Sequence, residues 1–391
     1  MVTIKEGIHW VGAVDWNIRN FHGYITHHGT TYNSYLILDE KVALVDFVKS
    51  SFADEQLARI REVIDPAKID YIIANHAEPD HSGSIRAITA AAPNAEILAT
   101  ERCVGTLQKY YGSDLKITPI DKKPTLRLGK RTLSFVPVPM AHWPDSMVTY
   151  VPEERLLLSN DAFGQHYASS MRFDDEVDEG ELWREATAYY ANILMPLWRS
   201  VIRALKALEG VQIDMIAPSH GIVWRKGVAS IVDRYRKWSA GETQQRAVVV
   251  YDTMWGSTEA LALALVEGLA SRGVETRLHR LYASHNSDAI TDILDAKAVL
   301  VGSPTLNNHL FPTVAGFLAY MRGLKPLNKI GAAFGSYGWA GGAKKAVEAE
   351  MQAAGIQLLE SDLDFSYRPG PEELRKAYDF GAMVGEKIRS G

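Results

Sequence analysis

The first 240 or so residues alternate short apolar runs with polar clusters. Helical spacing of apolar residues between some runs predicts helices over 52–63, 83–91 and 181–208. The apolar runs themselves, rich in β-branched side chains, predict strands at 35–38, 42–46, 71–75, 133–138, 156–160 and 213–217. Strands mixed with helices over this length predict an α/β sandwich with the helices outside.

From Arg246 onward the pattern becomes regular. Continuous apolar runs at 247–251, 298–302 and 330–334 are separated by helical stretches such as 257–272 and 341–354. This alternation predicts a parallel, doubly wound sheet. The mostly small and polar segment 238–243 predicts a linker, so we expect two domains, residues 1–243 and 244–391.

Composition narrows the possible functions. Apolar residues make up 47% and charged residues 23% of 391, as in ordinary globular proteins, and the formal net charge is −5. That charge gives no basic surface for nucleic acid or anionic membranes. The first six residues do not resemble a signal peptide, and no apolar run approaches the roughly 18 residues of a membrane-spanning helix. We therefore expect a cytoplasmic protein.

A single cysteine, Cys103, limits the metal chemistry. It excludes a disulfide framework, a four-cysteine zinc or rubredoxin site, and a cysteine-held iron–sulfur cluster. Any metal must be held mainly by nitrogen and oxygen.

Histidines and carboxylates follow four of the predicted strands. Acids near a helix N-terminus are favoured by its dipole, which would explain Asp80 but not the histidines on either side of it. The segment after 71–74 contains His76, Glu78, Asp80 and His81, and three later strands are followed by His142, Asp161 and His220. Together these seven residues favour one metal site at the rim of a sheet.

Other histidines fall into two groups. His22 and His166 are candidates to support the ligands or deliver protons, because ligand histidines need a partner for their second nitrogen. We expect the remaining ones to be ordinary: His9, His27, His28, His279, His285 and His309.

The second domain carries three candidate ligand-binding loops. Hydroxyl groups and Gly256 stand where a strand runs into a helix, so their donors can hold a phosphate without a basic residue. Two more loops follow the next two strands, at the edge where such sheets bind ligands. The candidate residues are Thr253, Met254, Trp255, Gly256, Ser257, Thr258, Pro304, Thr305, Leu306, Asn307, Asn308, Ser336, Tyr337, Gly338, Trp339, Ala340 and Gly341.

These motifs resemble known families. The first domain resembles the metallo-β-lactamase superfamily, with Glu78 where the usual motif has a second histidine. Glu78 and the spacing to His142, Asp161 and His220 are similar to the flavodiiron proteins, or A-type flavoproteins, and the three loops resemble flavodoxin binding FMN. The resemblance covers essentially the whole chain, including the segments 12–16 and 142–146.

The resemblance implies a ligand set and a fold. His76, Glu78 and His142 would hold one iron, and Asp80, His81 and His220 the other, with Asp161 bridging. Carboxylates mixed with imidazoles suit iron, and a bridge is expected for metals about 3.5–4 Å apart. The implied fold is an αββα sandwich followed by a flavodoxin-like domain with FMN at its loops, where Trp255, Tyr337 and Trp339 would pack on the ring.

The resemblance also implies an activity: reduction of O2 to water, NO to N2O, or both, with electrons relayed through FMN from rubredoxin or a similar carrier. It implies a head-to-tail homodimer, or a tetramer. One alternative is a dinuclear zinc hydrolase fused to a flavodoxin domain, against which Glu78 argues. The other is an electron carrier with a degenerate metal site, against which the complete set of seven ligand positions argues.

Overall fold

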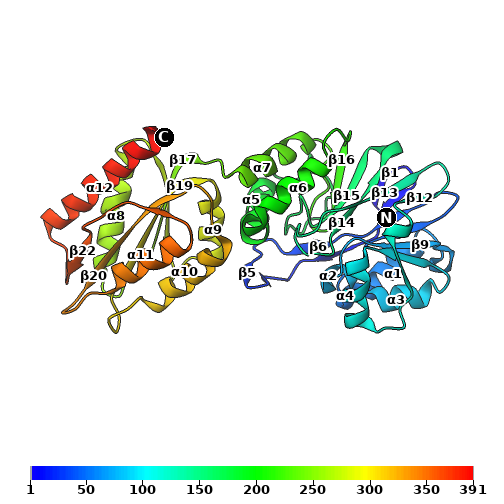
Figure 1. Ribbon diagram of the computed structural model, residues 1–391, viewed down its shortest axis with the longest axis horizontal. Coiled ribbons are helices and arrows are strands. Elements are labelled where there is room, and N and C mark those ends of the chain that lie inside the picture. Colours follow the sequence, from blue (N-terminus) through cyan, green and yellow to red (C-terminus); the bar gives the residue numbers. More distant parts are fainter. Residues whose placement is uncertain (1, 391) are drawn as a thin grey trace. The chain divides into compact units, whose positions relative to one another are not determined.

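Both halves of the chain contain helices mixed with strands, so the predicted α/β class is confirmed. The computed structural model describes residues 2–390 (Figure 1). The chain divides into two units. The first contains most of the residues up to Arg236, and the second contains those from Lys237 onward together with the short segments Gly23–Ile25 and Tyr190–Pro196.

The first unit is a sandwich of two sheets. The seven-stranded sheet has the order β1 (Val2–Lys5), β2 (Ile8–Trp10), β7 (Tyr35–Ile37), β8 (Ala43–Val45), β9 (Tyr71–Ala74), β10 (Glu96–Ala99) and β11 (Ile117–Pro119). The five-stranded sheet has the order β12 (Thr125–Arg127), β13 (Thr132–Pro137), β14 (Met147–Val151), β15 (Leu156–Asn160) and β16 (Met215–Pro218). A small two-stranded sheet pairs β3 (Ala13–Asp15) with β6 (Thr30–Tyr32). The short strand β4 (Asn20–Phe21) also belongs to this unit, whereas β5 (Tyr24–Ile25) lies in a segment of the second unit.

Alternation along the strands fills the two sides of the seven-stranded sheet. Ile73 on β9 points inward and packs in one core with Phe135 and Leu158 of the other sheet, whereas its neighbour Ile72 belongs to the outer core with Leu57. That outer core is covered by α1 (Ala53–Arg61), α3 (Ile85–Ala91) and α4 (Glu101–Tyr111). The short helix α2 (Pro79–Ser82) lies between α1 and α3 in the sequence.

The helical segment predicted over 181–208 is not one continuous helix, which corrects the prediction. It consists of α5 (Glu179–Tyr189), a π-helical turn (Tyr190–Leu194), a 3-10 turn (Met195–Leu197) and α6 (Trp198–Ala207). Pro196 has no N–H to donate and its ring crowds the preceding turn, so a regular α-helix cannot pass through this point. Figure 1 shows α5, α6 and α7 (Val228–Ala240) on the side of the five-stranded sheet.

The linker predicted at 238–243 is wrong in its first half. Helix α7 continues to Ala240, because Trp238 is buried and donates a hydrogen bond from its indole nitrogen to Asp295 at 3.0 Å. Only residues 241–243 join α7 to β17 (Gln244–Tyr251). The boundary between 243 and 244 stays a prediction.

The second unit contains the parallel, doubly wound sheet that the sequence predicts. Its strand order is β18 (Glu275–Arg280), β17, β19 (Ala296–Pro304), β20 (Ile330–Tyr337) and β21 (Gln357–Leu358), and β22 (Asp364–Ser366) also pairs with β20. One face is covered by α8 (Ser257–Ala270) and α12 (Pro371–Ser390). The other face carries α9 (Asn286–Asp295), α10 (Pro312–Leu324) and α11 (Ala343–Ala353) (Figure 1).

Two glycines let α8 and α12 touch along their backbones. A Cβ atom on Gly268 would overlap the carbonyl oxygen of Tyr378, and one on Gly381 would overlap the carbonyl oxygen of Leu265. Any larger residue at either position must push the helices apart.

None of the helices within residues 2–390 combines the length and the apolar character needed to cross a bilayer.

We expect Gly268→Ala to lower the free energy of unfolding of the second unit by about 1–3 kcal/mol, because the added methyl group overpacks the helix contact. Gly316→Ala is the matched control: this glycine is also inside a helix, α10, but nothing lies within 4 Å of its missing Cβ. That change should be neutral or stabilising by about 0.5–1 kcal/mol. Urea unfolding of the FMN-free protein measures both, and equal effects of the two substitutions would contradict the packing argument.

Candidate metal centre

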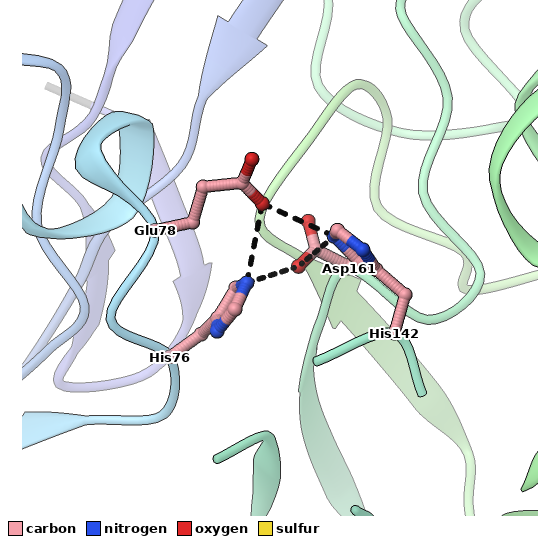
Figure 2. Close-up of side chains that lie close together, drawn as sticks. All are labelled: His76, Glu78, His142 and Asp161. Carbon is pink, nitrogen blue, oxygen red and sulfur yellow. Dashed lines mark hydrogen bonds and ion pairs between the residues drawn. The ribbon is translucent and has the colours of Figure 1, made fainter. Parts of the chain in front are cut away.

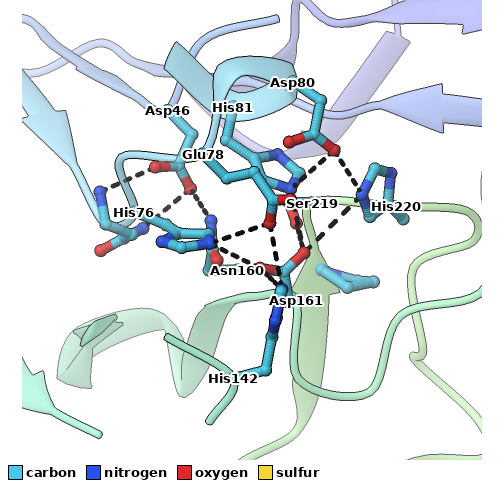
Figure 3. A network of polar contacts seen from close by, with 12 residues as sticks. Asp46, His76, Glu78, Asp80, His81, His142, Asn160, Asp161, Ser219 and His220 are labelled. Atoms are coloured by element: carbon cyan, nitrogen blue, oxygen red, sulfur yellow. Dashed lines mark hydrogen bonds and ion pairs between the residues drawn. The ribbon is translucent and has the colours of Figure 1, made fainter. Parts of the chain in front are cut away.

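Loops at the ends of four strands supply the candidate ligands. His76 and Glu78 follow the end of β9, and α2, which begins one residue later, carries Asp80 and His81. From the other sheet, the loops after β13, β15 and β16 supply His142, Asp161 and His220. The structure thus brings all seven predicted residues together between the two sheets, and Figure 3 shows them around a common centre.

The first group contains His76, Glu78, His142 and Asp161 (Figure 2). Glu78 Oε2 lies 3.2 Å from the Nε2 atoms of both His76 and His142. Asp161 Oδ2 lies 3.6 Å from His76 Nε2 and 3.4 Å from His142 Nε2. Four donor atoms from two sheets therefore surround one point.

The second group contains Asp80, His81 and His220. Asp80 Oδ2 lies 3.3 Å from His81 Nε2 and 3.1 Å from His220 Nε2. The other oxygen of Asp161, Oδ1, lies 2.9 Å from His81 Nε2 and 3.7 Å from His220 Nε2. Because each oxygen of Asp161 faces a different group, this carboxylate is placed as a bridge would be.

The residues fit two metal ions. Atoms bound to one ion at about 2.0–2.2 Å lie about 3.0–3.5 Å apart, which is close to the spacings in both groups. Asp80 Oδ1 is buried and has no hydrogen-bond partner within residues 2–390, and the buried Asp80 Oδ2 and Asp161 Oδ2 have histidine nitrogens nearby but no well-aligned hydrogen bond. Buried polar atoms normally have partners, so a cation is the partner that this arrangement implies.

Burial and opposite charge compete at these side chains. Burial disfavours the charged form of His76, but hydrogen bonds to Asp145 and Glu78 raise its pKa to about 10. Burial likewise disfavours ionised Glu78, yet His142 and His76 lower its pKa to about 2. Burial opposes the charge of Asp161 as well, and the nearby His81 and His142 hold its pKa well below the ordinary value. Metal ions would replace the protons on these histidines, so binding should release protons.

Polar residues outside the ligand set hold the loops in place. Asp145 accepts hydrogen bonds from the backbone N–H of Ala77 at 2.7 Å and from His76 Nδ1 at 3.0 Å. Asp46 accepts from the side-chain amides of Asn75, at 2.9 Å, and of Asn160, at 3.3 Å, each of which directly precedes a ligand. The buried Asp46 therefore ties the loop of His76 to the loop of Asp161 (Figure 3).

The two supporting histidines suggested by the sequence lie at the centre in different settings. His22 Nε2 lies 3.2 Å from Glu78 Oε1, and its side chain is 56% exposed. His166 is buried, shares a 2.8 Å hydrogen bond with the hydroxyl of Thr30, and packs its ring 4.7 Å from that of His220. Burial and the neighbouring His220 hold the pKa of His166 well below its ordinary value, so we expect its ring to be neutral.

Sequence reasoning missed the hydroxyl of Tyr189, which donates a 3.0 Å hydrogen bond to Asp161 Oδ1. It also missed Ser219, whose hydroxyl donates to the same oxygen at 3.3 Å. Ser219 precedes a predicted ligand, which was a usable signal. Tyr189 lies 28 residues from Asp161, and no local motif marks it.

An open pocket of about 440 Å³ lies beside this centre. Glu78 and Asp80 line it together with Phe21, His22 and Tyr111. One candidate ligand of each group can therefore be reached from outside by a small molecule.

The second unit brings its three predicted loops to one edge. They follow β17, β19 and β20, which are parallel neighbours. Thr258 and Ser336 share a 2.8 Å hydrogen bond between hydroxyls, and Thr305 donates its N–H to the carbonyl of Ser336 at 2.8 Å. Gly256 adopts a left-handed φ of 83° just before α8, which lets the loop turn into the helix N-terminus.

Aromatic side chains stand at the same edge. Trp255 and Trp339 are 93% and 91% exposed, so both are free to cover a bound planar ring. Met254 is 42% exposed and lies between Thr253 and Trp255. The arrangement offers hydroxyl and backbone donors for an anion, and aromatic surface for a ring.

Comparison with known proteins covers the whole chain. Residues 30–221 match the family described as ODP family beta lactamase, and residues 249–381 match Flavodoxin. A protein from Moorella thermoacetica named nitric oxide reductase is 49% identical over 393 residues, which cover 99% of this chain and 98% of that protein.

Two solved structures are also similar throughout. The flavodiiron protein from Giardia intestinalis has a TM-score of 0.97 and 38% identity, covering 100% of this chain and 97% of that one. The rubredoxin oxygen:oxidoreductase from the anaerobe Desulfovibrio gigas has a TM-score of 0.96 and 37% identity, covering 100% and 98%.

We expect Asp145→Asn to lower metal affinity by about 10- to 100-fold, because the substitution removes the negative charge that orients His76. Asp114→Asn is the control, since Asp114 is an exposed carboxylate paired with Arg86. Competition with a chromophoric chelator measures both affinities. Unchanged affinity in Asp145→Asn would contradict a supporting role for this residue.

Proposed function

Because this chain belongs to the flavodiiron protein family, we propose that it is an FMN- and diiron-dependent reductase of O2 to water, of NO to N2O, or of both. The observation that supports this most directly is the position of Asp161, whose two carboxylate oxygens face two separate groups of histidines and carboxylates. The similar proteins named above support it as well, and they favour a reductase over a zinc hydrolase.

The proposed ligands follow the two groups. His76, Glu78 and His142 would hold one iron, Asp80, His81 and His220 the other, and Asp161 both. When bound, iron supplies one-electron redox chemistry and a binding position for either gas, and FMN supplies a pair of electrons. The protein's own part is to keep the ligand atoms at fixed spacing and to leave the pocket beside Glu78 and Asp80 open.

FMN would bind at the edge of the second unit. The phosphate would meet the N-terminus of α8, where Ser257 and Thr258 begin the helix. The ring would meet the exposed Trp255 and Trp339, with Tyr337 at the end of β20. The other contributing residues would be those predicted in the three loops.

The stoichiometry of each reaction sets how many electrons and protons the protein must deliver. Reduction of O2 to two waters consumes four electrons and four protons, and reduction of two NO to N2O and water consumes two of each. We propose that electrons arrive from rubredoxin or a similar small carrier, because the lone Cys103 excludes a rubredoxin site in this sequence. The proposal includes a cytoplasmic location and a head-to-tail homodimer, in which the FMN of one subunit faces the metal centre of its partner.

We expect the iron- and FMN-loaded protein, once reduced chemically, to consume O2 or NO, and the zinc-loaded protein to consume neither, because zinc has no redox chemistry. Gas electrodes and detection of N2O measure both reactions at equal gas concentrations. Failure of the iron form to consume either gas, with both cofactors bound, would overturn the proposed function.

The dimer can be tested by complementation. Asp161→Ala should abolish the metal centre, and Ser257→Asp should weaken FMN binding by placing a negative charge at the phosphate position. Each homodimer should be inactive. A mixed dimer should recover about half of the wild-type rate, since one intact metal centre would face one intact FMN.

Co-expression with two different tags allows the mixed dimer to be purified. Ser271→Asp is the control for added charge, because Ser271 lies at the far end of α8. It should retain FMN. A mixed dimer as inactive as its parents would contradict the head-to-tail arrangement.

A further inference from the structure

Glu185 is a buried carboxylate that the proposed metal and FMN sites do not use. It lies on α5 with its side chain only 6% exposed, whereas glutamates are mostly at the surface. Burying a carboxyl group is costly unless it is paired, and its partner is His28, whose Nδ1 lies 2.9 Å from Glu185 Oε1. The pair therefore needs an explanation.

His28, the partner of Glu185, is partly exposed to solvent. The side chain of His28 is 41% exposed, so one end of the pair is in contact with water and the other end is inside the protein. Around them lie His27 and Arg184, whose charges favour ionised Glu185, and Tyr167, whose ring is 5.7 Å from that of His28. Burial outweighs these charges and raises the pKa of Glu185, so this carboxyl holds its proton to a higher pH than an exposed glutamate.

The buried face of α5 carries polar residues from this pair to the metal centre. Glu185 and Tyr189 are both on the buried face of the helix and are one turn apart, with about 5–6 Å expected between their Cβ atoms. The hydroxyl of Tyr189 donates to Asp161 Oδ1. Polar side chains on one buried face of α5 thus lie between the pair and Asp161.

The segment that follows His28 also reaches the metal centre. Thr30 is two residues after His28 and begins β6. Its hydroxyl lies 2.8 Å from His166 Nδ1 and 3.3 Å from His220 Nδ1. Both the helix and the strand segment that carry the pair thus continue to polar groups that touch the candidate ligands.

We propose that His28 and Glu185 form a proton-loading pair, which takes protons from solvent at His28 and passes them from Glu185 along the inward face of α5 toward Tyr189 and the metal centre. The inference rests on the proposed reduction of O2 or NO, which consumes one proton for every electron delivered to the gas. Glu185 acts at a distance from the gas, so it is a residue that supplies protons rather than one that touches substrate. Each proton it passes inward is replaced through His28, and no net charge accumulates on the pair.

The test uses Glu185→Gln, which keeps the shape and can still accept a hydrogen bond from His28 but cannot carry a proton. We expect it to bind iron and FMN and to be reduced without oxygen as the wild type is. Reoxidation of its FMN by O2 in stopped flow should be about 10- to 100-fold slower, with a larger solvent deuterium isotope effect. The matched control is Glu181→Gln, an exposed glutamate one turn earlier on α5 that accepts a hydrogen bond from Tyr167. It should behave as the wild type.

A second variant tests the proposal if Glu185→Gln fails to fold or to bind iron. His28→Ala removes the exposed partner, and it should slow reoxidation in the same way. Added imidazole should restore the rate, because it replaces the missing proton carrier and leaves any lost packing unrepaired. A wild-type rate in either variant, or a slow His28→Ala that imidazole does not restore, would overturn the proposal.

Infrared spectroscopy of the metal-free protein separates this inference from the proposed function. The wild type should show a protonated carboxyl band that persists above the ordinary titration range of glutamate and is missing in Glu185→Gln. Absence of that band in the wild type would overturn the proton-loading pair alone. A wild type that shows the band but reduces neither gas would overturn the proposed function and, with it, the role of the pair.

Discussion

The buried carboxylate of Asp161 is the group on which the rest of the first unit depends. An isolated buried anion costs several kcal/mol, so the chain must bring positive or metal-bound partners to it. Histidines do so on both sides: His76 and His142 face Oδ2, and His81 faces Oδ1. Because these residues come from both sheets, the site can form only when the two sheets are packed face to face.

The supporting contacts follow from the same requirement. Asp46 holds the amides of Asn75 and Asn160, so the loops that carry His76 and Asp161 are fixed relative to each other. The hydroxyl of Tyr189 reaches Asp161 from α5, which then gives way to a π-helical turn. π-Helical turns are rare overall but occur often at functional sites, and here one directly follows Tyr189, the residue that contacts Asp161.

Sequence patterns predicted most of this architecture because the ligands stand in short motifs after apolar strands. The strands that precede the ligands, the two folds and the residues that meet at the centre were accessible in that way. Contacts between segments far apart in the sequence could not be predicted. Nothing local links His28, which the sequence marks as ordinary, to Glu185, and the buried face of α5 shows only in three dimensions. Pro196 was a usable sequence signal for the break in the predicted helix. The extension of α7 into the predicted linker depends on the burial of Trp238, which only the structure shows.

Anomalous X-ray diffraction at the iron absorption edge, from crystals of the iron-loaded protein, tests the central claim most directly. We expect two iron peaks, one on each side of Asp161, about 3.5–4 Å apart. One peak would lie among His76, Glu78 and His142, and the other among Asp80, His81 and His220. A single peak, or two peaks that leave Asp161 bound to only one of them, would contradict the bridged dinuclear centre.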